Sequence, residues 1–305
     1  MAAVEWPTLL LLFGLFAAWG TLTWFHADLP AWIVYPLGAV ILTWHSSTQH
    51  EIVHGHPTRW PSVNHFLGVV PLSLWVPFER YRETHLTHHI DERLTDPYDD
   101  PETYYWTRAD WAGLGPLGRA LVRAQSTLLG RLTIGPFWNI ARWFWSEGRR
   151  VIDGAPNARW IWVEHLLWCV PVVAWVTAAC GMSIWAYVFG MVIPGTALLM
   201  VRSFAEHRAR DAVRQRTAIV ENARFFGPLF LYNNLHSVHH ENPGLPWYRY
   251  NAAYRANRDR LLRDNGGLLY NSYFDVARRY LLTPHDTPEH PTDRAPLPPA
   301  ADRGT

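Results

Sequence analysis

Four long apolar stretches restrict the fold of this chain more than any other feature of its sequence. Residues 9–25 and 31–44 contain no charged side chain and are separated by a short turn, so they predict two antiparallel membrane-spanning helices. A second pair, 160–179 and 182–200, is joined at Cys180 and Gly181. With flanking helical turns included, the predicted spans cover residues 9–25, 31–48, 160–179 and 182–203. The composition agrees, because 49% of the residues are apolar and only 17% are charged, below the usual level of about a quarter.

The arginines predict how these spans are oriented. All 27 basic residues are arginine, and they avoid the short turns within each pair while crowding residues 80–159 and 202–279. The positive-inside rule therefore places both termini and the long polar segments on the cytoplasmic side. The formal net charge of +1 gives no case for nucleic acid binding, and we expect the arginines to face anionic lipid head groups instead. The sequence thus predicts an all-α membrane protein with four transmembrane helices, arranged as two hairpins, and a cytoplasmic helical lobe.

Three further segments differ in composition from the spans. Residues 60–78 are weakly apolar and interrupted by prolines, which predicts a re-entrant or interfacial element. Residues 106–157 mix Trp and Leu with arginine, which is typical of helices that lie at the membrane interface or pack on a polar lobe. The proline-rich end has almost no apolar periodicity. We therefore predict one integral-membrane domain over residues 1–282 and a disordered tail over residues 283–305.

Histidines gather in three clusters whose spacing indicates metal binding. Eight of the 16 histidines lie in three short motifs, namely His50 and His54 in HEIVH, His85, His88 and His89 in HLTHH, and His236, His239 and His240 in HSVHH. Side chains at i, i+3 and i+4 share one face of a helix, so each motif can direct its imidazoles at one point. A catalytic zinc takes three protein ligands and a water, so eight histidines are enough for two metal ions with open positions. Imidazole suits zinc, copper, iron and nickel alike, so the ligand type does not choose the metal.

The first motif allows a different interpretation. HEIVH is also the H-E-x-x-H signature of zinc proteases, in which Glu51 would be the general base. A membrane zinc metalloprotease is therefore an alternative, although it leaves at least five clustered histidines without a role. A metal transporter is a further alternative, and it would place ionisable residues deep in the spans, where this chain has almost none.

In their order and positions, the three motifs resemble the histidine boxes of the membrane fatty acid desaturase superfamily. HEIVH lies near the end of the second predicted span, HLTHH follows about thirty residues later, and NNLHSVHH comes after the second hairpin. The superfamily also contains lipid hydroxylases, hydrocarbon oxygenases and carotenoid ketolases. The resemblance implies a non-haem di-iron centre, with two Fe ions held almost wholly by histidine and O2 as co-substrate, so that residues 1–282 would form a di-iron oxidase domain.

The resemblance implies further residues at this centre. A histidine at the cytoplasmic end of the fourth span often joins the ligands in this superfamily, and His207 has that position. Ser203 stands where acyl desaturases have an asparagine that can hold a metal-bound water. Asn233 and Asn234 resemble asparagines that support the ligands through hydrogen bonds. The acidic run 95–102 is expected to supply carboxylates that orient ligand N–H groups, with an ordinary turn rich in Asp and Pro as the alternative.

The implied reaction is oxidation of an unactivated C–H bond in a lipid. We expect a fatty acyl chain or similar lipid tail to enter an apolar tunnel while its polar end rests among cytoplasmic arginines. The candidates for that contact are Arg202, Arg208, Arg210, Arg214 and Arg216. Fatty acyl desaturation is the leading prediction, and lipid or hydrocarbon hydroxylation and carotenoid ketolation, which begin with the same hydrogen abstraction, are the alternatives.

The electrons for such a reaction are expected from another protein. The chain has no H-P-G-G stretch of a fused b-type cytochrome and no rubredoxin-like C-x-x-C pair. We therefore expect a ferredoxin, a rubredoxin or a b-type cytochrome to dock on the cytoplasmic face. The stretch NNLHSVHHENPGLPWY is similar to bacterial members of the superfamily, so the expected location is a bacterial inner membrane.

Overall fold

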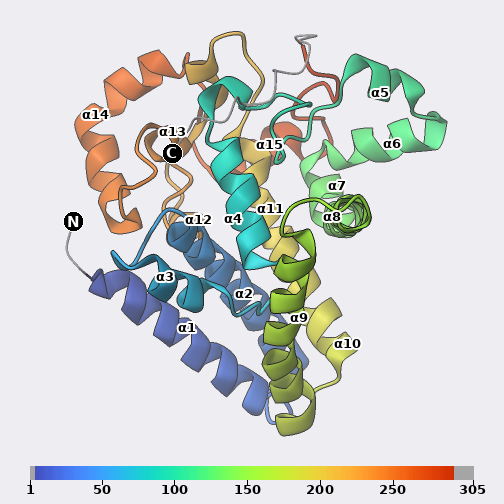
Figure 1. The fold of residues 1–305 in the computed structure, drawn as a ribbon. Coiled ribbons are helices and arrows are strands. Elements are labelled where there is room, and N and C mark those ends of the chain that lie inside the picture. The colour runs from blue at the N-terminus through green and yellow to red at the C-terminus, as the bar shows by residue number, and fades with distance from the viewer. Residues whose placement is uncertain (1–3, 292–305) are drawn as a thin grey trace.

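The computed structural model describes residues 4–291 and consists almost entirely of helices (Figure 1). The α-helices are α1 (Trp6–Trp24), α2 (Ala31–Val53), α3 (Pro61–Gly68), α4 (Phe78–His88), α5 (Arg108–Gly113), α6 (Pro116–Gln125), α7 (Leu128–Thr133), α8 (Gly135–Ile152), α9 (Ala158–Ala174), α10 (Ile184–Tyr187), α11 (Ile193–Glu206), α12 (Phe226–Leu229), α13 (His236–Glu241), α14 (Tyr250–Asp264) and α15 (Tyr273–Tyr280). The 3₁₀-helices are η1 (Asp91–Arg93), η4 (Val213–Arg216) and η5 (Trp247–Arg249), and the π-helices are η2 (Trp175–Ala179) and η3 (Val188–Val192). The short strands β1 (Ile219–Val220) and β2 (Leu269–Tyr270) pair in parallel, with Ile219 opposite Leu269.

Three helical segments of the described chain are long and apolar enough to cross a membrane. They are Trp6–Trp24, Ala158–Ala179 and Ile184–Glu206. They agree with three of the four predicted spans, and the exposed apolar side chains along α1 and α9 suit contact with lipid. The protein is therefore a mostly helical membrane protein.

The second predicted span, residues 31–48, lies within α2 and stays a prediction. This helix has 23 residues, but its second half carries a run of polar side chains that begins at His45 and leads into the HEIVH motif. In Figure 1, α2 runs upward from the turn after α1 and meets the histidine-bearing helices above. The polar half of α2 thus reaches the metal-binding motif, and α2 is not one of the three segments apolar enough to cross a membrane.

The turns that join the apolar helices lie on one side of the molecule. Trp24, at the end of α1, packs on Trp175 at the start of η2, with ring centroids 5.7 Å apart. The Trp175 indole N–H donates to Thr23 Oγ1 at 2.9 Å. Helices α5, α13 and α14 lie at the opposite end in Figure 1. The polar lobe is therefore on the side away from the two short turns, as the distribution of the arginines predicts.

Helices α2 and α11 cross closely in the apolar part. A Cβ atom on Gly195 would lie 3.1 Å from the carbonyl oxygen of Ala39 and 3.3 Å from Cβ of Leu42. The Thr43 hydroxyl donates to the carbonyl oxygen of Gly195 at 2.9 Å. Such close approach of two backbones is the geometry that small residues permit in membrane helices.

We expect the substitution Gly195→Leu to lower the thermal midpoint of the detergent-solubilised protein, because the added side chain must push α2 and α11 apart. Overpacking of this kind costs about 1–3 kcal/mol. Gly14→Leu is the matched control, since Gly14 lies in α1 and a Cβ there meets nothing within 4 Å. Equal midpoints for the two variants in a thermal melt would contradict the close crossing.

The prediction of a disordered tail from residue 283 is wrong for residues 283–291. The Trp106 N–H donates to the carbonyl oxygen of Pro288 at 2.8 Å, and the His290 N–H donates to the carbonyl oxygen of Trp106 at 3.0 Å. His285 is buried, and its Nε2 lies 2.8 Å from the hydroxyl of Tyr270. This pairing with distant segments holds the proline-rich stretch in place, and its local composition does not reveal it. Residues 292–305, the rest of the predicted tail, lie outside the described residues.

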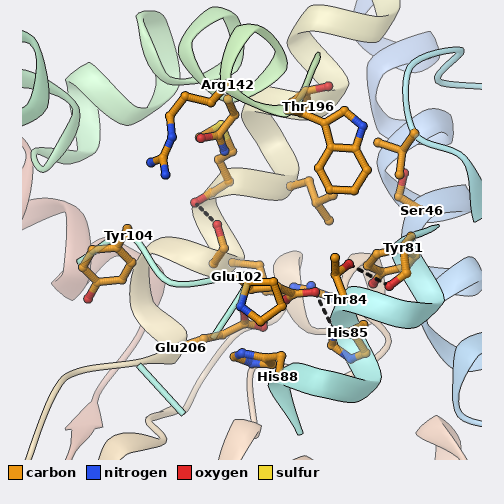
Figure 2. Close-up of a pocket in the computed structure, with 18 of the residues that line it drawn as sticks. Ser46, Tyr81, Thr84, His85, His88, Glu102, Tyr104, Arg142, Thr196 and Glu206 are labelled. Atoms are coloured by element: carbon orange, nitrogen blue, oxygen red, sulfur yellow. Dashed lines mark hydrogen bonds and ion pairs between the residues drawn. The ribbon is translucent and has the colours of Figure 1, made fainter. Parts of the chain in front are cut away.

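A cavity of about 520 Å³ opens between α4, α8 and α11. Figure 2 shows His85 and His88 of α4 on one wall, with Arg142 and Thr196 at the opposite end. Apolar side chains such as Leu42, Val192 and Leu199 also line it. The cavity therefore connects the apolar helices with two of the histidine motifs.

Candidate metal centre

Four chain segments bring the predicted histidines together at the ends of helices. His50 lies in the last turn of α2, and His54 is the residue that follows its end. The HLTHH motif forms the last turn and C-cap of α4, and the HSVHH motif forms α13. His207 follows the end of α11 in an extended conformation. Because side chains three and four apart share one face of a helix, each of these segments directs its imidazoles into the same space.

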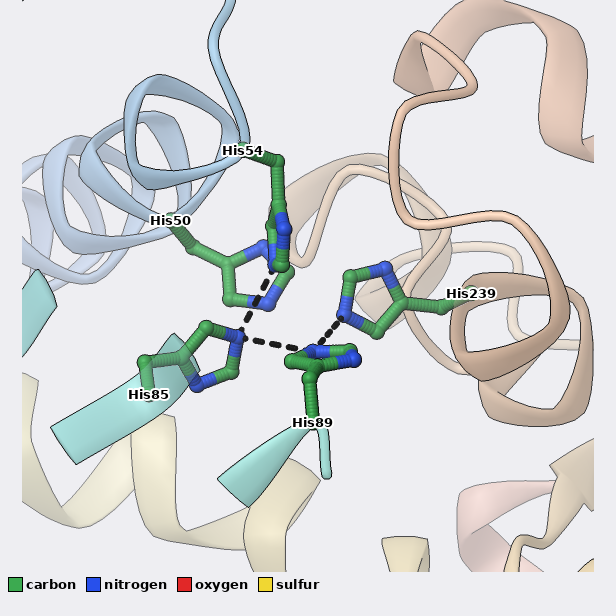
Figure 3. Close-up of side chains that lie close together, drawn as sticks. All are labelled: His50, His54, His85, His89 and His239. Carbon is green, nitrogen blue, oxygen red and sulfur yellow. Dashed lines mark hydrogen bonds between the residues drawn. The ribbon is translucent and has the colours of Figure 1, made fainter. Parts of the chain in front are cut away.

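The nine histidines form two groups, and in each group the possible ligand atoms all lie within 4.8 Å of one another. The first histidine group is His50, His54, His85, His89 and His239, shown in Figure 3. The second histidine group is His88, His207, His236 and His240. All nine histidines expected from the motifs and the resemblance therefore lie in one of these groups, and no other histidine does.

The separations of the ring nitrogens suit a shared metal ion. In the first histidine group, His85 Nε2 lies 3.0 Å from His54 Nε2 and 3.1 Å from His89 Nε2. In the second, His207 Nε2 lies 2.9 Å from Nε2 of both His88 and His236. Two nitrogens bound at right angles to one ion, each at about 2.1 Å, lie about 3 Å apart. Each group therefore has the spacing of neighbouring ligands around a single ion.

The two groups are adjacent because α4 and α13 each contribute to both. His85 and His89 belong to the first group, whereas His88 between them belongs to the second. The rings of His89 and His240, one from each group, are stacked with centroids 4.3 Å apart. Two ions held in these groups would lie side by side.

The other ring nitrogen of several histidines is fixed by a hydrogen bond. His85 Nδ1 lies 3.0 Å from Glu102 Oε1, and His88 Nδ1 lies 2.9 Å from Asp100 Oδ1. His236 Nδ1 lies 2.9 Å from Asn233 Oδ1. An ionised carboxylate or an amide oxygen can only accept, so Nδ1 carries the hydrogen in these rings, and Nε2 of each ring keeps a lone pair when the ring is neutral. Lone pairs that converge without a hydrogen between them require a cation, and this donor set therefore fits a metal ion.

These contacts test the expectations for the residues around the ligands. The expectation that the acidic run supplies orienting carboxylates is confirmed for Asp100 and Glu102. Asn233 supports His236, whereas Asn234 donates to the backbone carbonyl of Val220 at 2.7 Å and so supports the chain before α13. Tyr250, whose hydroxyl lies 2.8 Å from His239 Nδ1, was missed because no sequence motif marks it.

Burial keeps most of these imidazoles neutral. It lowers the pKa of His236, His239 and His240 well below the usual value, and neighbouring histidines lower it further. Although burial also opposes the charge on His88, the carboxylates of Asp100 and Glu102 raise the pKa of this ring to about 9. Metal ligation requires the neutral imidazole, so metal binding at His88 must release a proton near neutral pH.

Glu51 has a different environment from the histidines beside it. Its carboxylate accepts a hydrogen bond from the Trp247 N–H at 3.0 Å, and the side chain is buried. It belongs to neither histidine group, and it is not part of the cavity lining. A protease general base must reach the metal-bound water, so this position does not support the zinc metalloprotease alternative.

Two of the five arginines expected at the polar end of the substrate, Arg202 and Arg216, are buried. Arg202 forms an ion pair with Glu206 at 2.9 Å, and Arg216 donates to the carbonyl oxygen of Arg210 at 2.7 Å. Both guanidinium groups thus have partners inside the fold, and their contact with the polar end of the substrate stays a prediction. Ser203, at the position of the family asparagine, lines the cavity and lies 3.4 Å from the carbonyl oxygen of Met200.

Comparison with known proteins identifies the family. The family model described as "Fatty acid desaturase" matches residues 27–274, a range that includes all nine histidines. No curated protein matches the chain. The match covers most of the chain and agrees with the grouped histidines, which can hold metal. The chain therefore belongs to the fatty acid desaturase family of oxidoreductases.

Proposed function

We propose that this protein is an O2-dependent di-iron enzyme that oxidises an unactivated C–H bond in a lipid, and that the reaction is fatty acyl desaturation. The observation that carries this proposal is the division of nine histidines into two adjacent groups beside one cavity. With two iron ions bound, the centre would supply the oxidation of the C–H bond by O2. The leading substrate is a fatty acyl chain, because three apolar helices and the cavity lining favour a lipid.

In this proposal each histidine group holds one iron ion, and the surrounding residues hold the rings in place. Asp100, Glu102 and Asn233 fix the hydrogen on Nδ1 of three ligands, so that Nε2 of each faces its ion. Four of the nine histidines, His85, His88, His207 and His236, line the cavity. A substrate in the cavity would thus lie beside both ions, while the packed helices around it limit access of water.

The proposed reaction needs an external supply of electrons. Desaturation takes one hydrogen from each of two neighbouring carbons, and O2 takes up these hydrogens with two electrons and two protons to give two water molecules. We propose that a ferredoxin, a rubredoxin or a b-type cytochrome delivers the electrons at the cytoplasmic face of a bacterial inner membrane. Hydroxylation and ketolation use the same centre and remain alternatives, because they differ only in whether oxygen is transferred to the carbon.

Lipid and pigment profiles of a host with and without the intact gene test this proposal. We expect a new double bond in the fatty acids of cells that carry the gene, and no change in cells that carry the His236→Ala variant. A new hydroxyl group would instead indicate hydroxylation, and a new keto group would indicate ketolation. Identical profiles in all three strains, with the protein present in the membrane and loaded with iron, would contradict the proposed oxidation of lipids.

A further inference from the structure

Four arginines line the cavity, and only two of them have carboxylate partners. Arg80 forms an ion pair with Glu147 at 2.7 Å, and Arg202 forms one with Glu206 at 2.9 Å. Arg131 and Arg142 form no ion pair with any carboxylate in residues 4–291. A guanidinium stays charged at every physiological pH, so the cavity contains two cations that nothing in the described chain neutralises.

Arg131 is the more deeply placed of the two. It comes from α7 and is only 6% exposed. Its Nε donates to the carbonyl oxygen of Gln125 at 3.2 Å, and its guanidinium carbon lies 5.3 Å from the centre of the Tyr104 ring. These contacts hold the side chain at the cavity wall but supply no negative charge. A buried charge without a counter-charge is costly, so an anion in the cavity would relieve a large desolvation penalty.

Arg142 comes from α8 and faces the same cavity, as Figure 2 shows. Burial lowers the pKa of Arg131, and the positive charge of Arg142 lowers it further. The three carboxylates of the lining are already engaged, Asp100 and Glu102 by histidines and Glu206 by Arg202. The surplus positive charge is therefore concentrated at Arg131 and Arg142.

The two faces of α8 indicate that this polar end of the cavity is a built site. Asn139, Arg142 and Ser146 lie on one face and line the cavity. Large apolar side chains on the opposite face are exposed to the outside, namely Phe137, Phe144, Trp145 and Ile152. A helix on a soluble lobe would expose its polar face. In α8 the side chains of Asn139, Arg142 and Ser146 border the cavity instead, the space that the substrate would occupy.

We propose that Arg131 and Arg142 bind the carboxylate of an unesterified fatty acid, so that the substrate is the free acid and not an acyl thioester or a lipid ester. The inference rests on the proposed function, since it names the substrate class of that same cavity. A guanidinium and a carboxylate match in charge and in the geometry of two parallel hydrogen bonds. An acyl thioester or ester has a neutral carbonyl at that end of the chain, and this carbonyl offers the two guanidinium groups no negative charge.

The test is the equilibrium binding of three ligand forms to the iron-loaded protein in nanodiscs, measured by calorimetry without reductant so that no turnover occurs. The probes are dodecanoate and hexadecanoate, their methyl esters and their coenzyme A thioesters. A hydrogen-bonded charge pair favours its partner by about tenfold or more in affinity, so we expect each free acid to bind about tenfold more tightly than its ester. We expect Arg142→Gln to abolish this preference and Arg142→Lys, which keeps the charge, to retain part of it.

Arg149→Gln is the matched control, because Arg149 lies two turns further along α8, is exposed, and is not part of the cavity lining. We expect it to bind all probes as the unmodified protein does. Arg131→Gln is expected to behave as Arg142→Gln does, and its thermal midpoint shows whether the protein remains folded. Equal binding of acid and ester, tighter binding of the thioester, or an acid preference that survives Arg142→Gln would overturn the carboxylate site.

Failure of this inference can be told apart from failure of the proposed function. If reduced protein oxidises the esters or thioesters at a rate that Arg142→Gln does not change, the carboxylate site is wrong and the proposed function stands. If the acids bind in the expected order but no probe is oxidised in the presence of reductant and O2, the carboxylate site stands and the proposed reaction is wrong.

Discussion

Replacing His236 with alanine is expected to lower the iron content of the purified protein from about two ions to about one ion per chain and to abolish lipid oxidation. The second histidine group has four members, and His236 Nε2 lies next to two of them, at 2.9 Å from His207 and 3.1 Å from His240. Its loss leaves three imidazoles for that ion. A catalytic metal contributes several kcal/mol to a reaction barrier, so the rate should fall roughly a thousandfold or more.

Replacing a histidine of the first histidine group with alanine should have a smaller effect on metal content. His239→Ala leaves four imidazoles there, so we expect more iron to remain than in His236→Ala. Iron is measured by mass spectrometry of the purified protein and product by gas chromatography of the lipids. His26→Ala is the control, because His26 belongs to neither histidine group. It forms a hydrogen bond with the carbonyl oxygen of Thr23 at the turn after α1. Full iron in His236→Ala, or loss of iron in His26→Ala, would refute the assignment.

The second large effect is expected from Asp100→Ala, which leaves every ligand in place. Asp100 is buried and accepts from His88 Nδ1 at 2.9 Å and from the Thr95 N–H at 2.8 Å. Without it the His88 ring can rotate, and its buried N–H loses its partner. Loss of such a partner weakens metal binding by about 10–100-fold, so Asp100→Ala should release iron at lower chelator concentrations than the unmodified protein does.

Two matched variants separate this effect from damage to the loop. Asp96→Ala removes a carboxylate from the same loop, but this carboxylate accepts from the Tyr98 N–H and not from a histidine, so we expect ordinary iron retention. Asp100→Asn keeps an oxygen that can accept from His88. Its iron retention should therefore lie between those of Asp96→Ala and Asp100→Ala. Competition with a chelator, followed by iron analysis, gives the order directly. If Asp96→Ala and Asp100→Ala lose iron equally, the contact with His88 does not support the ligand.

Local helix geometry explains why the candidate site could be read from the sequence. Imidazoles at i, i+3 and i+4 share a helix face wherever that helix lies, so HLTHH and HSVHH each predict a set of ligands without knowledge of the fold. The apolar stretches are equally local, and three of them appear as long apolar helices. His207 stands alone in the sequence, and only the resemblance to a known family indicated it.

Contacts between distant segments explain what could not be predicted. The prolines of residues 284–291 suggest disorder, but the pairing of Trp106 with Pro288 and His290 holds this stretch on the lobe. Tyr250 supports His239 from a different helix. In each case the partner that decides the role is not marked by any local pattern.

The sequence by itself determined that the chain is a helical membrane protein with eight clustered histidines suited to bind metal, because hydropathy and helical periodicity depend only on neighbouring residues. Only the tertiary structure decided how these histidines divide. It separates His88 from His85 and His89 and joins it to His207, His236 and His240. It also places Arg142, from α8, at the cavity that borders both groups. These arrangements depend on how α4, α8, α11 and α13 pack against one another, which the order of residues along the chain does not reveal.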